Sequence, residues 1–167
     1  AIKELKSMIS FDDGVSWNYI EPPKKNLNNK DFDCNINSWK TGECSLHLHS
    51  VTTANYFGFV YSSSSTAGFL MGVGNVGSHL LSYEDCDTFL STDGGITWNV
   101  VARGPHQYEF GDMGSLIVII DDKNPTNYIS YSSDYGSTWE KLELGVTIKA
   151  KLLTTDHESL FPEFIVI

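Results

Sequence analysis

Apolar residues in this chain alternate with polar residues or gather in short runs, and helix-like spacing is almost absent. Gly, Asn, Asp and Ser separate the runs, and these residues favour turns. The runs include SLHLHSV (45–51), GFLMGVG (68–74), SLIVIID (115–121) and NYISYSS (127–133). Short apolar segments separated by turn residues are typical of strands rather than helices. We therefore expect an all-β fold.

One eight-residue pattern, Ser-x-Asp-x-Gly-x-Ser/Thr-Trp, occurs three times along the chain. The copies are SFDDGVSW (10–17), STDGGITW (91–98) and SSDYGSTW (132–139). Trp98 and Trp139 are 41 residues apart, and Trp17 and Trp98 are 81 apart, close to two such periods. A repeat of about 40 residues with several short strands is typical of a β-propeller blade, a four-stranded antiparallel sheet. The spacing predicts an incomplete part of a larger propeller.

The repeat divides the chain into parts of blades. We expect the end of one blade at 1–21, a blade with a polar loop at 22–104, a blade at 105–145 and the start of another at 146–167. In the blade at 105–145 the predicted strands lie near 107–111, 115–121, 128–132 and 138–144. Both ends of such a piece have unpaired sheet edges, which favour self-association.

Each residue of the repeated pattern has a mechanical role in a hairpin. The Asp carboxylate accepts hydrogen bonds from backbone N–H groups of its own turn. The Gly permits positive φ, and the Trp buries its ring between neighbouring sheets while its indole N–H finds an acceptor. The predicted structural residues are Ser10, Asp12, Gly14, Trp17, Ser91, Asp93, Gly95, Trp98, Ser132, Asp134, Gly136 and Trp139.

The alternative is that Asp12, Asp93 and Asp134 are catalytic acids or Ca²⁺ ligands. An active site needs one set of distinct groups, whereas this pattern places the same group on successive blades. Calcium also needs more carboxylates within the loop than DGG or DYG provides. We therefore expect no catalytic residue, no metal site and no cofactor.

Charge and cysteine content narrow the function classes. The 21 acidic and 11 basic residues give a net charge of −10, which disfavours nucleic-acid binding.

Cys34 and Cys44 flank a short polar stretch, so they form either a disulfide in an oxidising compartment or two free thiols. Cys86 is either a free buried thiol or half of another bridge.

Two further motifs carry weaker predictions. GVGNVG (72–77) matches the dinucleotide fingerprint G-x-G-x-x-G, but the required helix does not follow. We expect these glycines to form an irregular loop at a blade end. His47 and His49 share one face of a strand, but a zinc site needs further converging ligands, so we expect structural histidines.

The repeated pattern is the Asp box, which sialidases, some glycosidases and the sortilin/Vps10 receptors share. Two other segments resemble the Vps10/sortilin family more specifically. CSLHLHS (44–50), with Cys34 ten residues before it, resembles the Cys…Cys-Ser-Leu-His segment of Vps10 domains. The second Asp box is followed by Gly104-Pro105-His106-Gln107-Tyr108, which is similar to the family's Gly-Pro-His-Tyr segment with Gln107 as a variation. The resemblance extends along nearly the whole chain and is greatest to fungal vacuolar sorting receptors.

The resemblance implies a part of a ten-bladed luminal propeller in a single-pass membrane receptor of Golgi and endosomal compartments. Such a receptor binds peptide or protein cargo and carries soluble hydrolase precursors towards the vacuole. The resemblance also implies a disulfide between Cys34 and Cys44. It identifies no cargo-contact residue in this chain.

Two other functions remain open on the sequence. An Asp-box glycosidase such as a sialidase needs several arginines to bind the substrate carboxylate, and Arg103 is the only arginine here. A propeller with a structural or assembly role would bind no peptide cargo. Within the receptor interpretation, protonation of His47, His49, His79 or His106 is a candidate for acid-dependent cargo release.

Overall fold

The computed structural model of the chain describes residues 4–49, 66–155 and 161–167. Within them are twelve strands and three short 3-10 helices, η1 (Ile36–Thr41), η2 (Tyr83–Asp85) and η3 (Asp112–Gly114). No helix in these ranges is long and apolar enough to cross a lipid bilayer. The predicted all-β class is confirmed.

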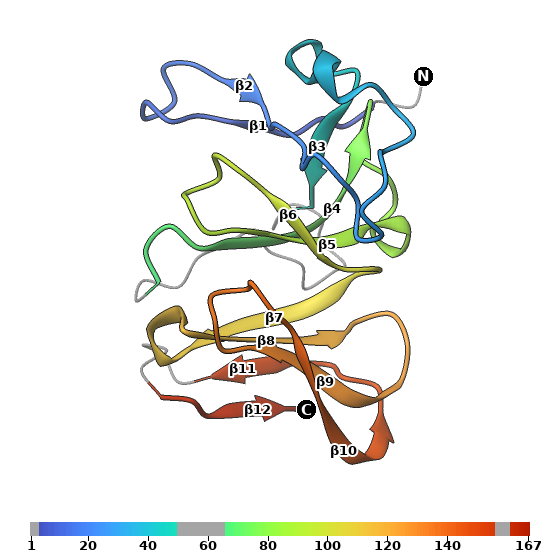
Figure 1. The fold of residues 1–167 in the computed structure, drawn as a ribbon, viewed down its shortest axis with the longest axis vertical. Coiled ribbons are helices and arrows are strands. Elements are labelled where there is room, and N and C mark those ends of the chain that lie inside the picture. Colours follow the sequence, from blue (N-terminus) through green and yellow to red (C-terminus); the bar gives the residue numbers. More distant parts are fainter. Residues whose placement is uncertain (1–3, 50–65, 156–160) are drawn as a thin grey trace.

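The strands form four antiparallel sheets, which follow one another in chain order along the long axis of the molecule (Figure 1). The first sheet pairs β1 (Met8–Ile9) with β2 (Asn18–Tyr19). The second contains β3 (Ser45–Leu48), β4 (Leu70–Gly77), β5 (Asp87–Ser91) and β6 (Asn99–Ala102). The third contains β7 (His106–Gly111), β8 (Leu116–Asp121), β9 (Thr126–Ser132) and β10 (Glu140–Ile148). The fourth pairs β11 (Leu153–Thr155) with β12 (Phe164–Val166). Four-stranded sheets whose neighbours follow sequence order are the blades that the repeat predicts.

An apolar layer lies between each pair of successive sheets. Ile9 of the first sheet and Ile20, which directly follows β2, pack with Phe89 of the second sheet and with Trp98, which directly precedes β6. The next layer joins Met71 and Leu90 of the second sheet to Phe110 and Ile117 of the third. The last joins Val118 and Ile120 of the third sheet to Leu153 and Val166 of the fourth. The four-stranded sheets are therefore buried on both faces.

Two-sided burial explains why LIVII (116–120) is apolar without a break. Successive side chains of a strand point to opposite faces of its sheet. In β8, Ile117 and Ile119 belong to the layer against the second sheet, while Val118 and Ile120 belong to the layer against the fourth. Every central position of the strand consequently needs an apolar side chain.

The prediction of an irregular loop at GVGNVG is wrong, because these residues form most of β4. β4 pairs with β3 on one side and β5 on the other, and Gly74 lies opposite Leu48 and Asp87. A Cβ atom at Gly74 would overlap the carbonyl oxygen of His47. The glycine therefore lets two strands approach closely, which is a recognised role of glycine inside a sheet.

Candidate functional site

The three Asp boxes are hairpin turns with the same hydrogen bonds. They connect β1 to β2, β5 to β6 and β9 to β10. In each, the serine hydroxyl donates to Oδ1 of the Asp at 2.8–2.9 Å. The same hydroxyl oxygen accepts the backbone N–H of the box glycine at 2.8–2.9 Å. The serine thus joins the start of the turn to its glycine.

The carboxylate of each box also fixes the residue before the tryptophan. Oδ1 accepts the backbone N–H of Ser16, Thr97 or Thr138 at 2.8–2.9 Å. Oδ2 accepts the hydroxyl of the same residue at 2.6 Å. Each carboxylate therefore accepts three hydrogen bonds from within its own eight residues.

These hydrogen bonds lower the pKa values of the three carboxyl groups. The hydroxyl of Thr138, followed by its backbone N–H, lowers the pKa of Asp134 to about 2. The equivalent groups of Ser16 lower the pKa of Asp12. Burial is the largest influence on Asp93 and raises its pKa, but the bonds from Thr97 and Ser91 outweigh it, and the pKa of Asp93 is lowered. A general acid must hold a proton near neutral pH, and these three groups do not.

The glycine and tryptophan complete the turn. Gly14, Gly95 and Gly136 have φ values of 87°, 92° and 84°, which side chains resist. The indole N–H groups of Trp17 and Trp98 donate to the carbonyl oxygens of Gly14 and Gly95 at 3.0 Å.

The tryptophans differ in burial within these 167 residues, and the burial expected for Trp17 stays a prediction for the longer protein. Trp98 is 3% exposed between the first and second sheets, and Trp139 packs against the layer between the second and third. Trp17 is 56% exposed. Its box belongs to the two-stranded sheet, and no described sheet covers that side of the hairpin.

Successive boxes touch through a contact that the spacing of the repeat does not predict. A Cβ atom on Gly95 would lie 2.7 Å from Cδ1 of Ile9, and one on Gly136 would overlap Cδ2 of Leu90. Ile9 and Leu90 directly precede the serine of the preceding box. We call this the inter-box contact. In the sequence this contact is marked by an apolar or aromatic residue directly before the serine of each box. These residues are Ile9, Leu90 and Tyr131.

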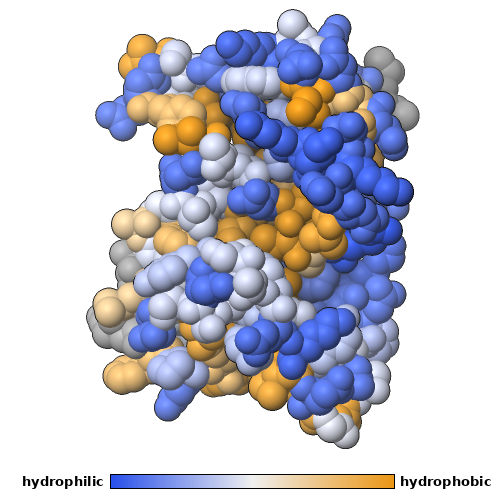
Figure 2. Space-filling view, viewed as in Figure 1, coloured by the Kyte–Doolittle hydropathy of each residue, from blue (hydrophilic) through white to orange (hydrophobic). Residues whose placement is uncertain are grey.

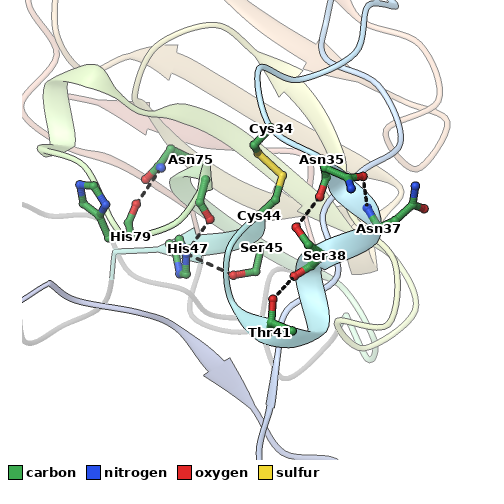
Figure 3. Close-up of a disulfide and its surroundings, with 11 residues drawn as sticks. Cys34, Asn35, Asn37, Ser38, Thr41, Cys44, Ser45, His47, Asn75 and His79 are labelled. Atoms are coloured by element: carbon green, nitrogen blue, oxygen red, sulfur yellow. Dashed lines mark hydrogen bonds between the residues drawn. A yellow bond between two sulfur atoms is a disulfide. The ribbon is translucent and has the colours of Figure 1, made fainter.

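The disulfide links the polar connection after β2 to strand β3. Cys34 and Cys44 form a bridge with Cα atoms 5.7 Å apart (Figure 3). Between them, Asn35 caps η1 by accepting the backbone N–H of Asn37 at 3.1 Å. Cys44 is fully buried and directly precedes β3.

Cys86 is a buried free thiol, and burial raises its pKa to about 12, so it stays protonated at neutral pH.

The histidines have structural partners. Nδ1 of buried His47 accepts the backbone N–H of Ser7 at 3.0 Å, so Nε2 carries the proton and donates to the Gly77 carbonyl at 3.1 Å. Burial lowers the pKa values of His47, His49 and His106. Within the described ranges no three His, Cys, Asp or Glu residues are grouped as a metal site would require. Acid-dependent release through these histidines stays a prediction.

Comparison with known proteins places this architecture in a family. The family model Sortilin-Vps10, described as sortilin, neurotensin receptor 3, matches residues 1–153. A vacuolar protein sorting/targeting protein 10 from Mycosarcoma maydis is 46% identical over 98% of this chain and 11% of its own length. The protein of that name from Eremothecium gossypii is 50% identical over 83% of the chain and 9% of its own length. An uncharacterized membrane glycoprotein from Saccharomyces cerevisiae is 49% identical over 83% of the chain and 12% of its own length. The chain thus spans about a tenth of the length of these relatives.

Proposed function

The chain belongs to the Sortilin-Vps10 family, and on that basis we propose that it is part of the cargo-binding propeller of a sorting receptor. The receptor carries soluble hydrolase precursors from the Golgi to the endosome and vacuole. The observation that carries this proposal is the family match along 1–153, together with relatives named for vacuolar protein sorting or targeting.

The sheet arrangement supports a β-propeller divided as the repeat predicts, and the family resemblance implies about ten blades in the whole propeller. The parts are 1–21, 22–104, 105–145 and 146–167. Two sheets have four strands, and both are covered by apolar layers on both faces. Neighbouring blades of a propeller cover each other in this way.

We propose a scaffold role, and no catalytic role, for the Asp boxes. Their carboxylates are ionised near neutral pH and each already accepts three hydrogen bonds from its own turn. The proposed site for cargo therefore does not include Asp12, Asp93 or Asp134.

The proposed location is the lumen of Golgi and endosomal compartments, in a receptor held by one membrane span. Support comes from the disulfide, since disulfides persist in oxidising compartments of the secretory pathway. A relative that is named a membrane glycoprotein also supports it.

Deletion of the full receptor gene in the source organism tests the sorting role. The expected result is secretion of vacuolar hydrolase precursors into the medium, reversed by the full-length receptor. Quantitative immunoblotting of medium and vacuoles gives the readout. Unchanged vacuolar delivery in the deletion strain contradicts the proposal. Hydrolysis of sialosides by the purified receptor, lost on mutation of a pocket carboxylate, would assign the glycosidase function instead.

A further inference from the structure

A groove with a volume of about 490 Å³ lies between the outer strand β6 and the connection that follows β2. Pro22, Pro23 and Leu27 line one wall, and Trp98 and Val100 line the other. In Figure 2 an apolar area lies over β6, beside the hydrophilic surface of the polar connection. The two walls come from segments about 75 residues apart in sequence, at 21–29 and 96–100.

The strand that forms one wall has an unpaired edge. β6 is the last strand of its sheet and hydrogen-bonds only to β5. Its residues, Asn99–Ala102, carry no charge. The corresponding outer strand of the next sheet, β10, carries Glu140, Lys141 and Glu143. Charged side chains protect an edge strand from pairing with other chains, and β6 lacks this protection.

The opposite wall is held in shape by its own hydrogen bonds. The backbone N–H of Asn26 donates to the Lys30 carbonyl at 2.9 Å. The Asn26 side-chain oxygen accepts the N–H groups of Asn28 and Lys30 at 3.0 and 3.1 Å. A wall that is already ordered loses little conformational entropy when a ligand enters the groove.

Two lysines lie on the rim of the groove, and one of them has no carboxylate partner among the described residues. Lys24 and Lys25 line it, and Glu21 is the carboxylate among the lining residues. Lys25 pairs with Asp31 at 2.8 Å, and Lys24 forms no ion pair with any residue that the structure describes. Lys24 is therefore placed to attract a carboxylate of a bound chain.

We propose that this groove binds an extended segment of a partner protein as an additional strand on β6. The segment hydrogen-bonds to the free edge of β6, places apolar side chains between Leu27 and Val100, and presents an acidic residue to Lys24. Edge pairing supplies affinity in this mode, and the pockets for alternate side chains supply specificity. The inference does not depend on the proposed sorting role.

The test measures fluorescence anisotropy of labelled peptides with the full-length receptor in detergent. The probe is an acetylated heptapeptide that alternates Glu and Val. One comparison peptide has N-methyl groups on its central residues, which remove backbone donors, and another has Lys in place of Glu. The expected result is saturable binding of the probe, with both comparison peptides weaker by about tenfold or more. Absence of saturable binding, or equal binding of the N-methylated peptide, overturns the proposal.

Substitutions locate the binding in the groove. Leu27→Asp and Lys24→Glu change exposed side chains, so the fold is retained, and each is expected to weaken probe binding by about tenfold. Lys151→Glu, on an exposed position before β11, is the matched control and leaves binding unchanged. Unchanged binding in the two groove variants overturns the proposal. Receptor self-association that Leu27→Asp abolishes, without probe binding, assigns the groove to a second copy and also overturns it.

Discussion

At the scale of single residues, the Asp box is complete within its own eight positions. The first box, with an exposed Trp17, has the same serine, carboxylate and indole bonds as the second, with a buried Trp98. The local hydrogen bonds therefore do not depend on burial. Burial is decided by whether another sheet lies over the hairpin.

The low pKa of Asp134 predicts a pH-dependent stability. The ordinary value is 3.8 and the folded value is about 2, so the folded state favours the ionised form. This stabilisation is complete above about pH 4 and is lost as the pH falls towards 2. Asp134→Asn is expected to lower the unfolding midpoint at pH 6 and to reduce its loss between pH 4 and 2. Thermal unfolding of the receptor's luminal region across this range measures both effects.

Asp13→Asn serves as the control for this experiment, because Asp13 lies in the first turn but accepts none of the bonds that define the box. It should leave the unfolding midpoint at pH 6 close to that of the unsubstituted protein. A profile for Asp134→Asn that is parallel to the wild type at every pH would contradict the assignment.

The difference in tryptophan burial predicts unequal mutational effects. Trp98→Ala removes a side chain that is 3% exposed between two sheets, and the expected loss is about 3–5 kcal/mol of unfolding free energy. In a protein limited to these 167 residues, Trp17→Ala, at 56% exposure, should cost less than about 1 kcal/mol. Chemical denaturation of the two variants measures the difference. Equal losses would contradict the described packing.

At the scale of elements, the strands are defined by burial on both faces and by close approach between neighbours. The sequence predicts β7 to β10 because apolar runs and turn residues alternate at the period of the repeat. The hydrogen bonds of the Asp boxes were also predictable, because the donors and acceptors all lie within the same eight residues. The prediction for β4 was wrong because glycine is common both in loops and where two strands approach closely. Only the tertiary structure, in which the His47 backbone lies against Gly74, shows that this glycine belongs to the second case.

Two other features could not be predicted from local sequence. The exposure of Trp17 depends on which sheets surround its hairpin. The groove beside β6 depends on how the 21–29 segment returns to a strand about 75 residues later. Both are properties of tertiary contacts between distant segments.

Gly74 gives a test of the close approach between β3 and β4. Gly74→Ala places a methyl group on the His47 carbonyl oxygen, and overpacking of this kind typically costs about 1–3 kcal/mol. Gly77→Ala is the matched control, because the nearest atom to its Cβ would be the Asn75 amide nitrogen at 3.4 Å. Denaturation should show a clear loss for Gly74→Ala and a smaller one for Gly77→Ala. The reverse order would contradict the register of β3 against β4.

The disulfide is expected to stabilise the connection before β3. It closes a loop between residues 10 apart in sequence, and bridges of this size contribute about 2–4 kcal/mol. The double substitution Cys34→Ser and Cys44→Ser should lower the unfolding midpoint and increase proteolysis of the 22–43 connection. Limited proteolysis followed by mass spectrometry locates the cleavage. Unchanged midpoint and cleavage would show that the bridge does not constrain this segment.

At the scale of the whole molecule, four sheets follow one another with an apolar layer at each interface. The inter-box contact repeats at two of these interfaces, where Ile9 meets Gly95 and Leu90 meets Gly136. A repeated contact between repeated units is how a propeller scaffold is built, and it leaves the chemistry of recognition to other surfaces.

We propose that this scaffold belongs to a receptor that binds hydrolase precursors without transforming them. Isothermal titration calorimetry of the full-length protein in detergent with a purified vacuolar hydrolase precursor tests this proposal. We expect saturable binding at neutral pH and recovery of the precursor unchanged. Absence of saturable binding, or recovery of a cleaved or deglycosylated precursor, would contradict it.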